Sequence, residues 1–326
     1  MDIIKSNIEE RIIPLLDKAG MYYRIFSRAK SKESIEKKLL AKGDVYRREN
    51  RKMQDIIGLR IVFYFQDDVL MFYNKLKTFY GYHRSNESSS KNDLSELTDI
   101  LSNCDDSTSM NKKLKKLLPF DDKIFMPERL NLVMEMNDQE KQMLDIHFSR
   151  RDIAYDKDLI DYTYEIQLRT VLSEGWHEVE HDIRYKTQSE PWWNFCSEES
   201  RMLNGIYASL ETSETSLSRL IDELAYKNFK NNSWDAMIRF HFRRRTLEKK
   251  LDPELCQILD QDPRIAKQIL HIERADLVSF LWNLNSKVPI STDFILFLVN
   301  RLVIRNEQIH ALESSAISAI LDNYQS

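Results

Sequence analysis

The chain has 326 residues and a mass of 38.8 kDa; 42% of its residues are hydrophobic and 31% are charged. Six Gly and seven Pro are few for this length, which excludes collagen-like and wholly disordered chains and favours a helix-rich protein of one large or two modest domains. Its three Cys (Cys104, Cys196 and Cys256) are too few and too widely spaced for a disulfide framework or a CxxC metal pair. We therefore expect a protein of the reducing cytoplasm.

The net charge does not indicate a nucleic-acid-binding protein, and the apolar runs do not indicate a membrane protein. The net charge is −4, and the N-terminal residues lack the basic-then-apolar order of a secretory signal. The most apolar run, Phe294–Val299, is far shorter than the roughly 18 residues that span a bilayer. We expect a soluble, intracellular protein without a membrane partner.

The first predicted elements lie in a basic segment. Residues 21–60 contain twelve Lys or Arg against five Asp or Glu. A helix is predicted over Ser34–Ala41, with Gly43 as its C-terminal stop. The β-branched and aromatic run Gly58–Phe65 then predicts a strand, and the acidic residues 67–68 are placed to cap a helix that continues to residue 80.

The rest of the chain divides into an α/β part and a helical part. Residues 83–123 are polar and turn-rich, which predicts an exposed insertion with one short helix. Strands are predicted over Leu130–Met136 and Tyr162–Arg169, followed by a helix over residues 171–186. Beyond residue 190 we find only helical patterns. We expect a mixed sheet flanked by helices in a domain of residues 1–190, and an all-helical C-terminal region over residues 191–326.

The strand at residues 162–169 alternates strictly, so three polar side chains share one face: Glu165, Gln167 and Arg169. An ordinary solvated sheet face explains this pattern about as well as a functional site does. Asp55, just before the strand at 58–65, favours the second interpretation. Two carboxylates from neighbouring strands can hold Mg²⁺, while Arg and Lys neutralise phosphate oxygens.

The segment His177–His181 matches the HExxH pattern, in which two His at i and i+4 bind zinc and the Glu acts as general base. The third ligand would have to be Glu198 or Glu199. This five-residue motif is common by chance in charged helices, so the zinc protease is a remote alternative. His181 as a hydrogen-bonding residue at the edge of a cleft is the better interpretation.

Four residues of the basic segment are spaced to hold a polyphosphate. Ser34 and Lys38 share a helical face, and Arg28 and Lys30 approach it from the preceding turn. A solvated basic helix would show the same spacing. The chain has no GxxxxGK[ST] loop and no GxGxxG after a strand, which argues against P-loop and Rossmann nucleotide sites.

Three ordered motifs together resemble the synthetase domain of the RelA/SpoT family. They are Arg28–Lys38, Asp55–Arg60 with the acidic pair that follows, and Glu165–Thr170 with the downstream Trp176, Glu180-His181 and Tyr185-Lys186. The resemblance covers roughly residues 20–190, and no HD-type hydrolase motif precedes it, as in the small synthetase-only members. It implies a nucleotidyltransferase-like fold and transfer of the β,γ-pyrophosphate of ATP to the ribose 3′-hydroxyl of GDP or GTP, which makes (p)ppGpp.

The resemblance also implies a role for each matching residue. The ATP phosphates would contact Arg28, Lys30, Ser34 and Lys38, with support from Arg60. Asp55 and Glu165 would bind Mg²⁺, and Glu165 could also act as general base toward the 3′-hydroxyl. The residues on the acceptor side would be Gln167, Arg169 and His181.

The chain departs from the family at the acceptor site. The family carries a Tyr-x-Ser-x-His motif whose Tyr stacks on the guanine, but the corresponding segment here is Phe125–Leu132. The segment Tyr82–Ser85 is superficially similar but precedes the insertion, so we do not expect it to replace the motif. Arg129 and Asn131 are the candidates for contacting the acceptor instead.

This departure leaves other functions open. Some small family members pyrophosphorylate the 3′ end of tRNA, and the basic segment Arg239–Lys250, with its interleaved Phe residues, could contact RNA. A helix surface that faces acidic residues of the first domain is the preferred explanation of that segment. A degenerate nucleotide-binding regulatory module is a further alternative, which the retained Asp55 and Glu165 disfavour. The helical region could also serve homo-oligomerisation.

Overall fold

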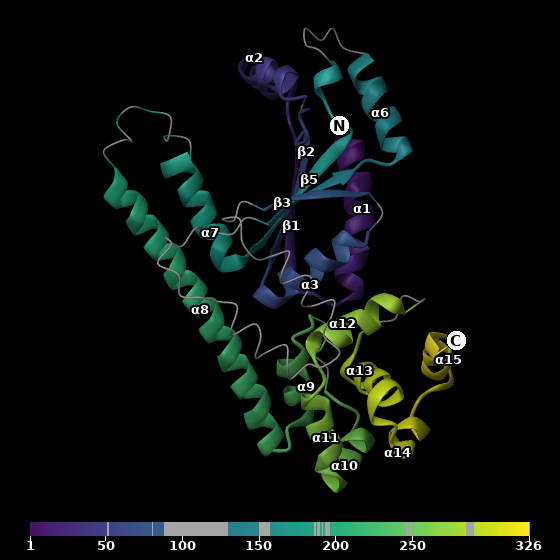
Figure 1. Ribbon diagram of the computed structural model, residues 1–326. Coiled ribbons are helices and arrows are strands. Elements are labelled where there is room, and N and C mark those ends of the chain that lie inside the picture. Colours follow the sequence, from purple (N-terminus) through teal and green to yellow (C-terminus); the bar gives the residue numbers. More distant parts are fainter. Residues whose placement is uncertain are drawn as a thin grey trace.

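The computed structural model describes residues 1–50, 52–79, 81–87, 130–149, 157–185, 196–245, 250–284 and 290–325, together with residues 187, 190, 192 and 247. A sheet flanked by helices is followed by an all-helical part (Figure 1). Within the described ranges, no helix is both long and apolar enough to cross a membrane. The expected fold class, a mixed sheet flanked by helices with an all-helical C-terminal part, is confirmed.

Five strands form one mixed sheet in the order β1-β2-β5-β4-β3. Their bounds are Tyr23–Ala29 (β1), Ile57–Phe63 (β2), Tyr82–Glu87 (β3), Leu130–Glu135 (β4) and Thr163–Thr170 (β5). The neighbours β2 and β5 run parallel, whereas the other three pairs are antiparallel. The three strands predicted from sequence patterns are β2, β4 and β5, which are the three inner strands of the sheet.

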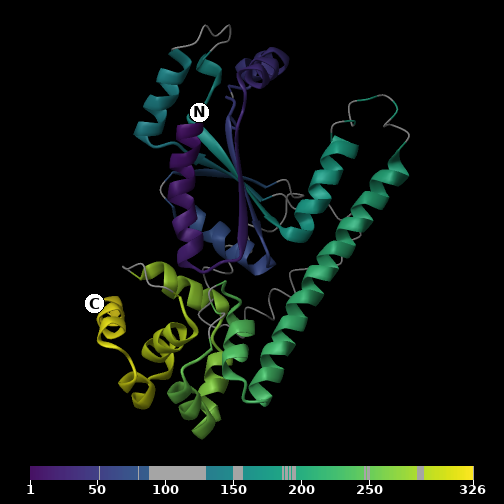
Figure 2. The same cartoon turned by 180° about the vertical axis from the view of Figure 1, so that it is seen from behind.

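Helices cover both faces of the sheet. Their bounds in the first part of the chain are Asp2–Lys18 (α1), Lys32–Arg48 (α2), Gln66–Lys77 (α3), Asp138–Ser149 (α6) and Val171–Glu180 (α7), with a 3-10 turn at Lys157–Leu159 and a π-helical turn at His181–Tyr185. Figure 1 and Figure 2 show α1 and α6 on one side of the sheet, and α7 with the long α8 (Ser197–Lys230) on the other.

The hydrophobic core lies between the sheet and α1. Ile4, Ile8, Ile12 and Leu16 recur every fourth residue along α1 and are all buried. They pack in one cluster with the apolar side chains of β5: Tyr164, Ile166 and Leu168. Because strand side chains alternate between faces, the polar residues of β5 must lie on the opposite face, toward α7.

Residues 197–325 hold the remaining helices: α8, Trp234–Phe242 (α9), Pro253–Gln261 (α10), Pro263–Leu270 (α11), Arg274–Asn283 (α12), Thr292–Val299 (α13), Glu307–Ala311 (α14) and Ser315–Gln325 (α15), with a π-helical turn at Asn300–Ile304. The helices from α9 onward form a second hydrophobic cluster. Val278 of α12 belongs instead to the first cluster, so the two parts share apolar contacts.

Buried charges join the helical part to α3. Asp68 and Arg244 are both fully buried, with 2.6 Å between the carboxylate oxygen and the guanidinium nitrogen. Next to them, Arg274 lies 2.5 Å from Asp67. The acidic pair at the start of α3 therefore binds the helical part of the chain. The expectation that this pair caps the helix is wrong, because the N-cap residue is Phe65.

Gly43 does not end its helix, contrary to the expectation. Helix α2 continues to Arg48, and the chain turns at Asn50, whose φ is +51°. A Cβ at Gly43 would lie 3.6 Å from Cδ1 of Leu159, so the glycine allows close packing against the chain before β5. A single glycine costs a helix only about 1 kcal/mol, which the packing of α2 readily offsets.

The start of the expected insertion at residues 83–123 is wrong. Tyr82–Glu87 forms the edge strand β3, antiparallel to β4. The rest of the predicted insertion lies outside the described residues. The Tyr82–Ser85 segment is therefore part of the sheet, but at its far edge, with β4 between it and β5.

Candidate functional site

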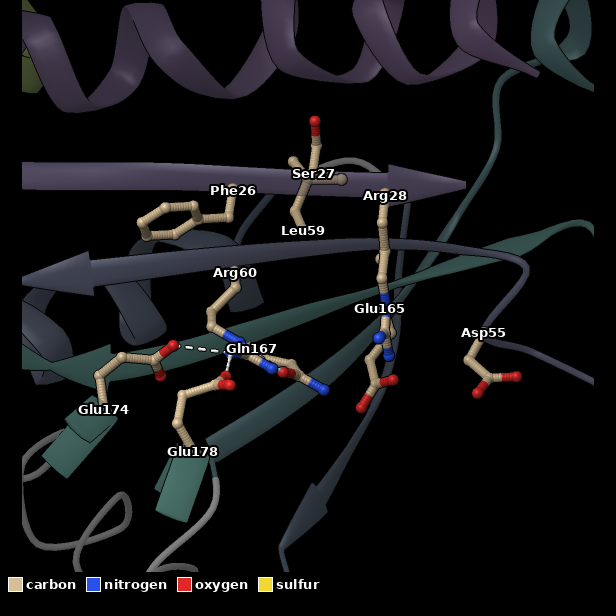
Figure 3. Close-up of a pocket in the computed structure, with 11 residues that line it drawn as sticks. Phe26, Ser27, Arg28, Asp55, Leu59, Arg60, Glu165, Gln167, Glu174 and Glu178 are labelled. Carbon is tan, nitrogen blue, oxygen red and sulfur yellow. Dashed lines mark hydrogen bonds and ion pairs between the residues drawn. The ribbon is translucent and has the colours of Figure 1, made fainter. Parts of the chain in front are cut away.

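A cavity of about 410 Å³ opens on the polar face of the sheet, beneath α7. Its lining residues come from β1, β2, β5, α7 and the chain before β2: Phe26, Ser27, Arg28, Asp55, Gly58, Leu59, Arg60, Glu165, Gln167, Glu174 and Glu178 (Figure 3). Five of the residues predicted from the sequence thus line one pocket: Arg28, Asp55, Arg60, Glu165 and Gln167.

Strand register explains why these residues meet. Across β1, β2 and β5 the pairing aligns Arg28 with Gly58 and Glu165, and two residues further along it aligns Phe26 with Arg60 and Gln167. Both rows lie on the same face, because residues two apart on a strand share a face. The sheet therefore brings Arg28 and Glu165, which are far apart in the chain, to the same end of the pocket.

Gly58 leaves room between Arg28 and Glu165. A Cβ at this position would lie 3.9 Å from both Cγ and Nε of Arg28, which is ordinary contact distance. Larger side chains would occupy the space that the Arg28 side chain crosses. Figure 3 shows Arg28 extending over this gap toward Glu165.

Asp55 lies between two lysines at the end of the pocket. Lys38 of α2 donates to both carboxylate oxygens at 2.7 and 2.8 Å, and Lys30 donates to one of them at 2.9 Å. The backbone N–H of Lys30 also donates to the carbonyl of Ile56, which fixes the end of β1 beside Asp55. Partial burial opposes ionisation of Asp55, but the hydrogen bonds from Lys38 and Lys30 outweigh it and hold its pKa below the ordinary value.

Arg60 is held on three sides at the other end of the pocket. Its Nε donates to Oε1 of Gln167 at 3.1 Å, and its NH1 donates to Glu174 at 2.6 Å and also to Glu178. Burial disfavours the charged guanidinium, but the two glutamates outweigh it and raise the pKa of Arg60. Arg60 therefore holds Gln167 in place and ties α7 to β2.

Helix α7 starts at a defined residue because of a capping box. Thr170 Oγ1 accepts from the backbone N–H of Ser173 at 3.1 Å, and Ser173 Oγ accepts from the N–H of Thr170 at 3.0 Å. Thr170 also donates to Glu214 of α8. Burial raises the pKa of Glu214, and the bond from Thr170 partly opposes that shift.

Two of the predicted acceptor residues contact each other beside the pocket. Arg169 is buried, and its NH2 lies 3.3 Å from Oδ1 of Asn131 on β4. Asn131 is paired in register with Gln167, so it extends the row formed by Phe26, Arg60 and Gln167. The row therefore crosses four strands, and its members on β2, β5 and β4 are polar.

Two of the predicted residues, Ser34 and His181, lie on the surface away from the lining of the pocket. Ser34 is exposed on α2, where its N–H and hydroxyl both bond to Ser31 Oγ, the helix cap. His181 is exposed and its Nδ1 lies 3.4 Å from Asp182 of its own turn. Arg129 lies outside the described residues.

The zinc-protease pattern gains no support from the structure. His177 is buried against the rings of Trp176 and Tyr207, whereas His181 lies on the exposed π-helical turn that follows α7. Among the described residues, no group of three or more His, Cys, Asp or Glu could hold a metal ion. Glu178 serves as a partner of Arg60.

Three arginines of the basic segment Arg239–Lys250 are paired with acidic residues. Arg243 bonds to Asp222 of α8, Arg244 to Asp68 of α3, and Arg245 to Asp17 of α1 at 2.7 Å. Arg243 and Arg244 are buried. These arginines face acids of the first part and of α8, as expected, but they do not lie on a helix surface, because α9 ends at Phe242 and the three follow it.

The sequence analysis missed Phe26 and Glu174 as functional candidates, and it considered Glu178 only as the general base of a zinc protease. Phe26 is 54% exposed in the pocket, and it lies on a strand that was not predicted. Glu174 and Glu178 are spaced i, i+4 on the helix that follows β5, which places both on one face. That spacing is a usable signal, but the overlapping HExxH pattern drew attention to the histidines.

Comparison with known proteins identifies the region that carries this pocket. Residues 27–190, slightly more than half of the chain, match the family described as the region found in RelA / SpoT proteins. No curated protein matches the chain.

Several solved structures are similar at low identity. The small alarmone synthetase 1 from Bacillus subtilis is 16% identical, with a TM-score of 0.38, over 67% of this chain and 88% of that one. The small alarmone synthetase 2 from the same organism is 19% identical, with a TM-score of 0.37, over 67% and 91%. A GTP pyrophosphokinase family protein from Streptococcus pneumoniae is 17% identical, with a TM-score of 0.40, over 68% and 87%.

The family assignment rests on the matched region, which begins in β1 and ends after α7 and therefore includes every lining residue of the pocket except Phe26. The chain belongs to the RelA/SpoT family.

Proposed function

We propose that this pocket transfers the β,γ-pyrophosphate of ATP to the ribose 3′-hydroxyl of GDP or GTP. The observation that carries the proposal is the convergence of Arg28, Asp55, Arg60, Glu165 and Gln167 in one cavity, inside the region that defines the family. Such a transfer depends on positioning and charge neutralisation more than on covalent help from the protein. The pocket supplies both cations and carboxylates for that purpose.

The donor phosphates lie at the Arg28 end of the pocket in this proposal. Arg28 lines the cavity, and Lys30 and Lys38 meet at Asp55 beside it. Bound triphosphate would give the two lysines phosphate oxygens as partners in addition to Asp55. Phe26, half exposed on the same strand as Arg28, presents an aromatic face on which the adenine can stack.

Glu165 takes the role of general base. The acceptor 3′-oxygen attacks the β-phosphorus of ATP, the bond from that phosphorus to the α,β-bridging oxygen breaks, and AMP leaves. The 3′-hydroxyl proton passes to the Glu165 carboxylate. The side chain of Glu165 lines the cavity from the strand next to Gly58, where it can face both substrates.

Asp55 and Glu165 are the residues that would hold Mg²⁺. Mg²⁺ is commonly bound by one or two carboxylates together with substrate phosphates, so a pair of carboxylates in a phosphate pocket fits the ion. The low pKa of Asp55 keeps this carboxylate ionised at neutral pH. When bound, the ion would neutralise charge on the phosphate oxygens.

The acceptor binds at the β5–β4 side of the pocket. Gln167 is held by Arg60, and Asn131 is held by Arg169, so both amides have fixed orientations. These groups can hydrogen-bond a nucleotide where the family uses its Tyr-x-Ser-x-His motif. We propose a cytoplasmic location, because ATP and GDP or GTP are the substrates of the proposed reaction.

The test offers three acceptors to the purified protein. It is incubated with γ-³²P-ATP and Mg²⁺ and with GDP, GTP or bulk tRNA in separate reactions, and the products are resolved. Label on GDP or GTP, with AMP formed in equal amount, is the expected result. Label only on tRNA would replace the proposal with the tRNA-modifying alternative. No transfer at all, with ATP still bound, would favour the regulatory module.

A further inference from the structure

Arg84 of the edge strand β3 lies on the polar face of the sheet. In the strand pairing it is aligned with Val133 of β4, and Val133 is aligned with Glu165 of β5. Residues that are aligned across neighbouring strands have their side chains on the same face of the sheet. Arg84 therefore continues the row of Arg28 and Glu165 to the edge of the sheet at β3.

An extra residue in β3 gives Arg84 this orientation. Tyr82 and Arg84 are two residues apart, but they are aligned with the adjacent residues Met134 and Val133 of β4. His83 is thus the extra residue of a β-bulge, and such a bulge changes the direction in which the following side chains point. Tyr82 packs against the hydrophobic core, whereas Arg84 is exposed. In a regular strand both side chains would lie on the core face.

A hydrogen bond holds the Arg84 guanidinium near the end of the pocket. Its NH2 donates to Oε1 of Gln54, the residue directly before Asp55. The carbonyl oxygen of Gln54 accepts from Oγ1 of Thr163, which lies on the pocket face of β5, at 3.3 Å. The side-chain amide of Gln54 also donates to Asp161 at 2.9 Å. Arg84 therefore contacts an uncharged group, which orients the guanidinium without neutralising its charge.

The acceptor of the proposed reaction needs such a cation. GDP and GTP carry two or three phosphate groups on the 5′ carbon of the ribose, and the reacting hydroxyl is on the 3′ carbon. The acceptor side of the pocket holds the uncharged Gln167 and Asn131, and the buried Arg169 donates to Asn131 and to the Leu168 carbonyl. These groups can hydrogen-bond a nucleotide, but a cation at the sheet edge is better placed for its phosphates.

The spacing of the strands suits a nucleotide between Glu165 and Arg84. Neighbouring strands lie about 4.8 Å apart, so the backbones of these two residues are separated by roughly 10 Å. The residue between them is Val133, whose small apolar side chain leaves room for a ribose. A ribose in this position directs its 3′-hydroxyl to Glu165 and its 5′ carbon to Arg84.

We propose that Arg84 binds the 5′-phosphates of the acceptor nucleotide, on the side of the ribose opposite Glu165. The inference rests on the proposed function, because it names the group that holds the acceptor of that reaction. A guanidinium donates two parallel hydrogen bonds to phosphate oxygens, which gives orientation as well as affinity. Arg84 thus selects a nucleoside di- or triphosphate over a nucleoside without phosphates.

The first experiment measures binding without ATP, so that it does not depend on transfer. Isothermal titration calorimetry of the full chain compares GDP with guanosine. The wild type should bind GDP roughly ten- to a hundredfold more tightly, and Arg84→Gln should lose most of this difference. Arg24→Gln is the matched control, because Arg24 is exposed on β1 at the other edge of the sheet. Equal affinities of Arg84→Gln and the wild type for GDP would overturn the proposal.

The second experiment separates the acceptor from the donor by steady-state kinetics. In Arg84→Gln the KM for GDP should rise by roughly ten- to a hundredfold, while the KM for ATP stays unchanged. Arg84→Lys, which keeps the charge, should have an intermediate KM for GDP. An equal rise in both KM values would show a general distortion of the site and contradict the proposal. A protein that binds GDP through Arg84 but transfers no pyrophosphate to it would contradict only the proposed function.

Discussion

At the scale of single residues, two of the four carboxylates that line the pocket, Asp55 and Glu165, have different surroundings. Asp55 accepts from Lys30 and Lys38, and these bonds keep its pKa low. Glu165 lies across the gap at Gly58 from Arg28. We call Asp55 with Lys30 and Lys38 the Asp55 cluster. Under the proposed function this cluster binds the donor phosphates and their Mg²⁺, and Glu165 accepts the proton of the reacting hydroxyl.

Lys38→Met tests the role of this cluster, because the substitution keeps the alkyl chain and removes the charge. Hydrogen bonds between charged groups contribute about 1.5–3 kcal/mol, so kcat/KM for ATP should fall by roughly ten- to a hundredfold. The acidic limb of the pH–rate profile should also move to higher pH, since one of the bonds that lower the pKa of Asp55 is lost. Lys37→Met, on the exposed neighbour in α2, should change neither quantity. Equal effects of the two variants would remove Lys38 from the site.

Phe26→Ala should weaken ATP binding. Stacking of a base on an aromatic ring contributes about 1–3 kcal/mol, which corresponds to roughly a 5- to 150-fold rise in KM for ATP. KM for the acceptor should change much less, and Phe26→Tyr should retain the wild-type value. Tyr64→Ala is the control, because Tyr64 is also a half-exposed aromatic but does not line the pocket. An unchanged KM for ATP in Phe26→Ala would show that the ring does not contact the base.

At the scale of whole elements, β1, β2 and β5 create the site through their register. Gly58 is the position in β2 at which a side chain would separate Arg28 from Glu165. The strand itself tolerates β-branched residues well, so a substitution here should affect the pocket more than the fold.

Gly58→Val should lower kcat/KM at least tenfold while far-UV circular dichroism stays unchanged, because its methyl groups occupy the space of the Arg28 side chain. Gly58→Ala should have a milder effect, since its Cβ would be at ordinary contact distance, 3.9 Å, from Arg28. Steady-state kinetics measures kcat/KM of the two variants, which should fall further in Gly58→Val than in Gly58→Ala. A Gly58→Val enzyme as active as the wild type would contradict the proposed position of Arg28.

The elements that could be predicted from the sequence are those with a strong local pattern. The alternation in β5 separates Glu165 and Gln167 from the core residues, and the structure shows the same two faces. The helical patterns found beyond residue 190 likewise predict α8. In contrast, β1 lies within a basic segment whose charges hide its alternation, although every second residue of it is exposed.

The contacts that could not be predicted depend on tertiary structure. Arg60 meets Glu174 and Glu178 more than a hundred residues away, and no local pattern indicates that pairing. Gly43 likewise has the signature of a helix stop, but its role is set by packing against Leu159. The sequence also does not show that Ser34 bonds to the cap of its own helix and lies outside the pocket.

At the scale of the whole molecule, buried charges join the helical part to the α/β part. Arg244 and Asp68 have no solvent contact, and burial raises the pKa of Asp68 while the Arg244 charge opposes that shift. A buried pair of this kind contributes little by itself, but removing one partner leaves an uncompensated charge.

Arg244→Met should therefore lower the free energy of unfolding by about 3–5 kcal/mol. The double variant Asp68→Leu with Arg244→Met should recover most of this loss, because it leaves no buried charge unpaired. Urea denaturation of the two variants and the wild type gives the comparison. A double variant less stable than Arg244→Met alone would contradict this interpretation of the pair.

The most direct test of the proposed function compares the rate of pyrophosphate transfer in three proteins. The wild type, Glu165→Gln and the control Glu135→Gln are each incubated with γ-³²P-ATP, Mg²⁺ and GDP. Glu135 ends β4 and does not line the cavity, so its substitution should leave the rate unchanged. We predict labelled product from the wild type and a loss of roughly 10²- to 10⁴-fold in Glu165→Gln, the range expected for a general base. Wild-type transfer by Glu165→Gln would contradict the proposed site.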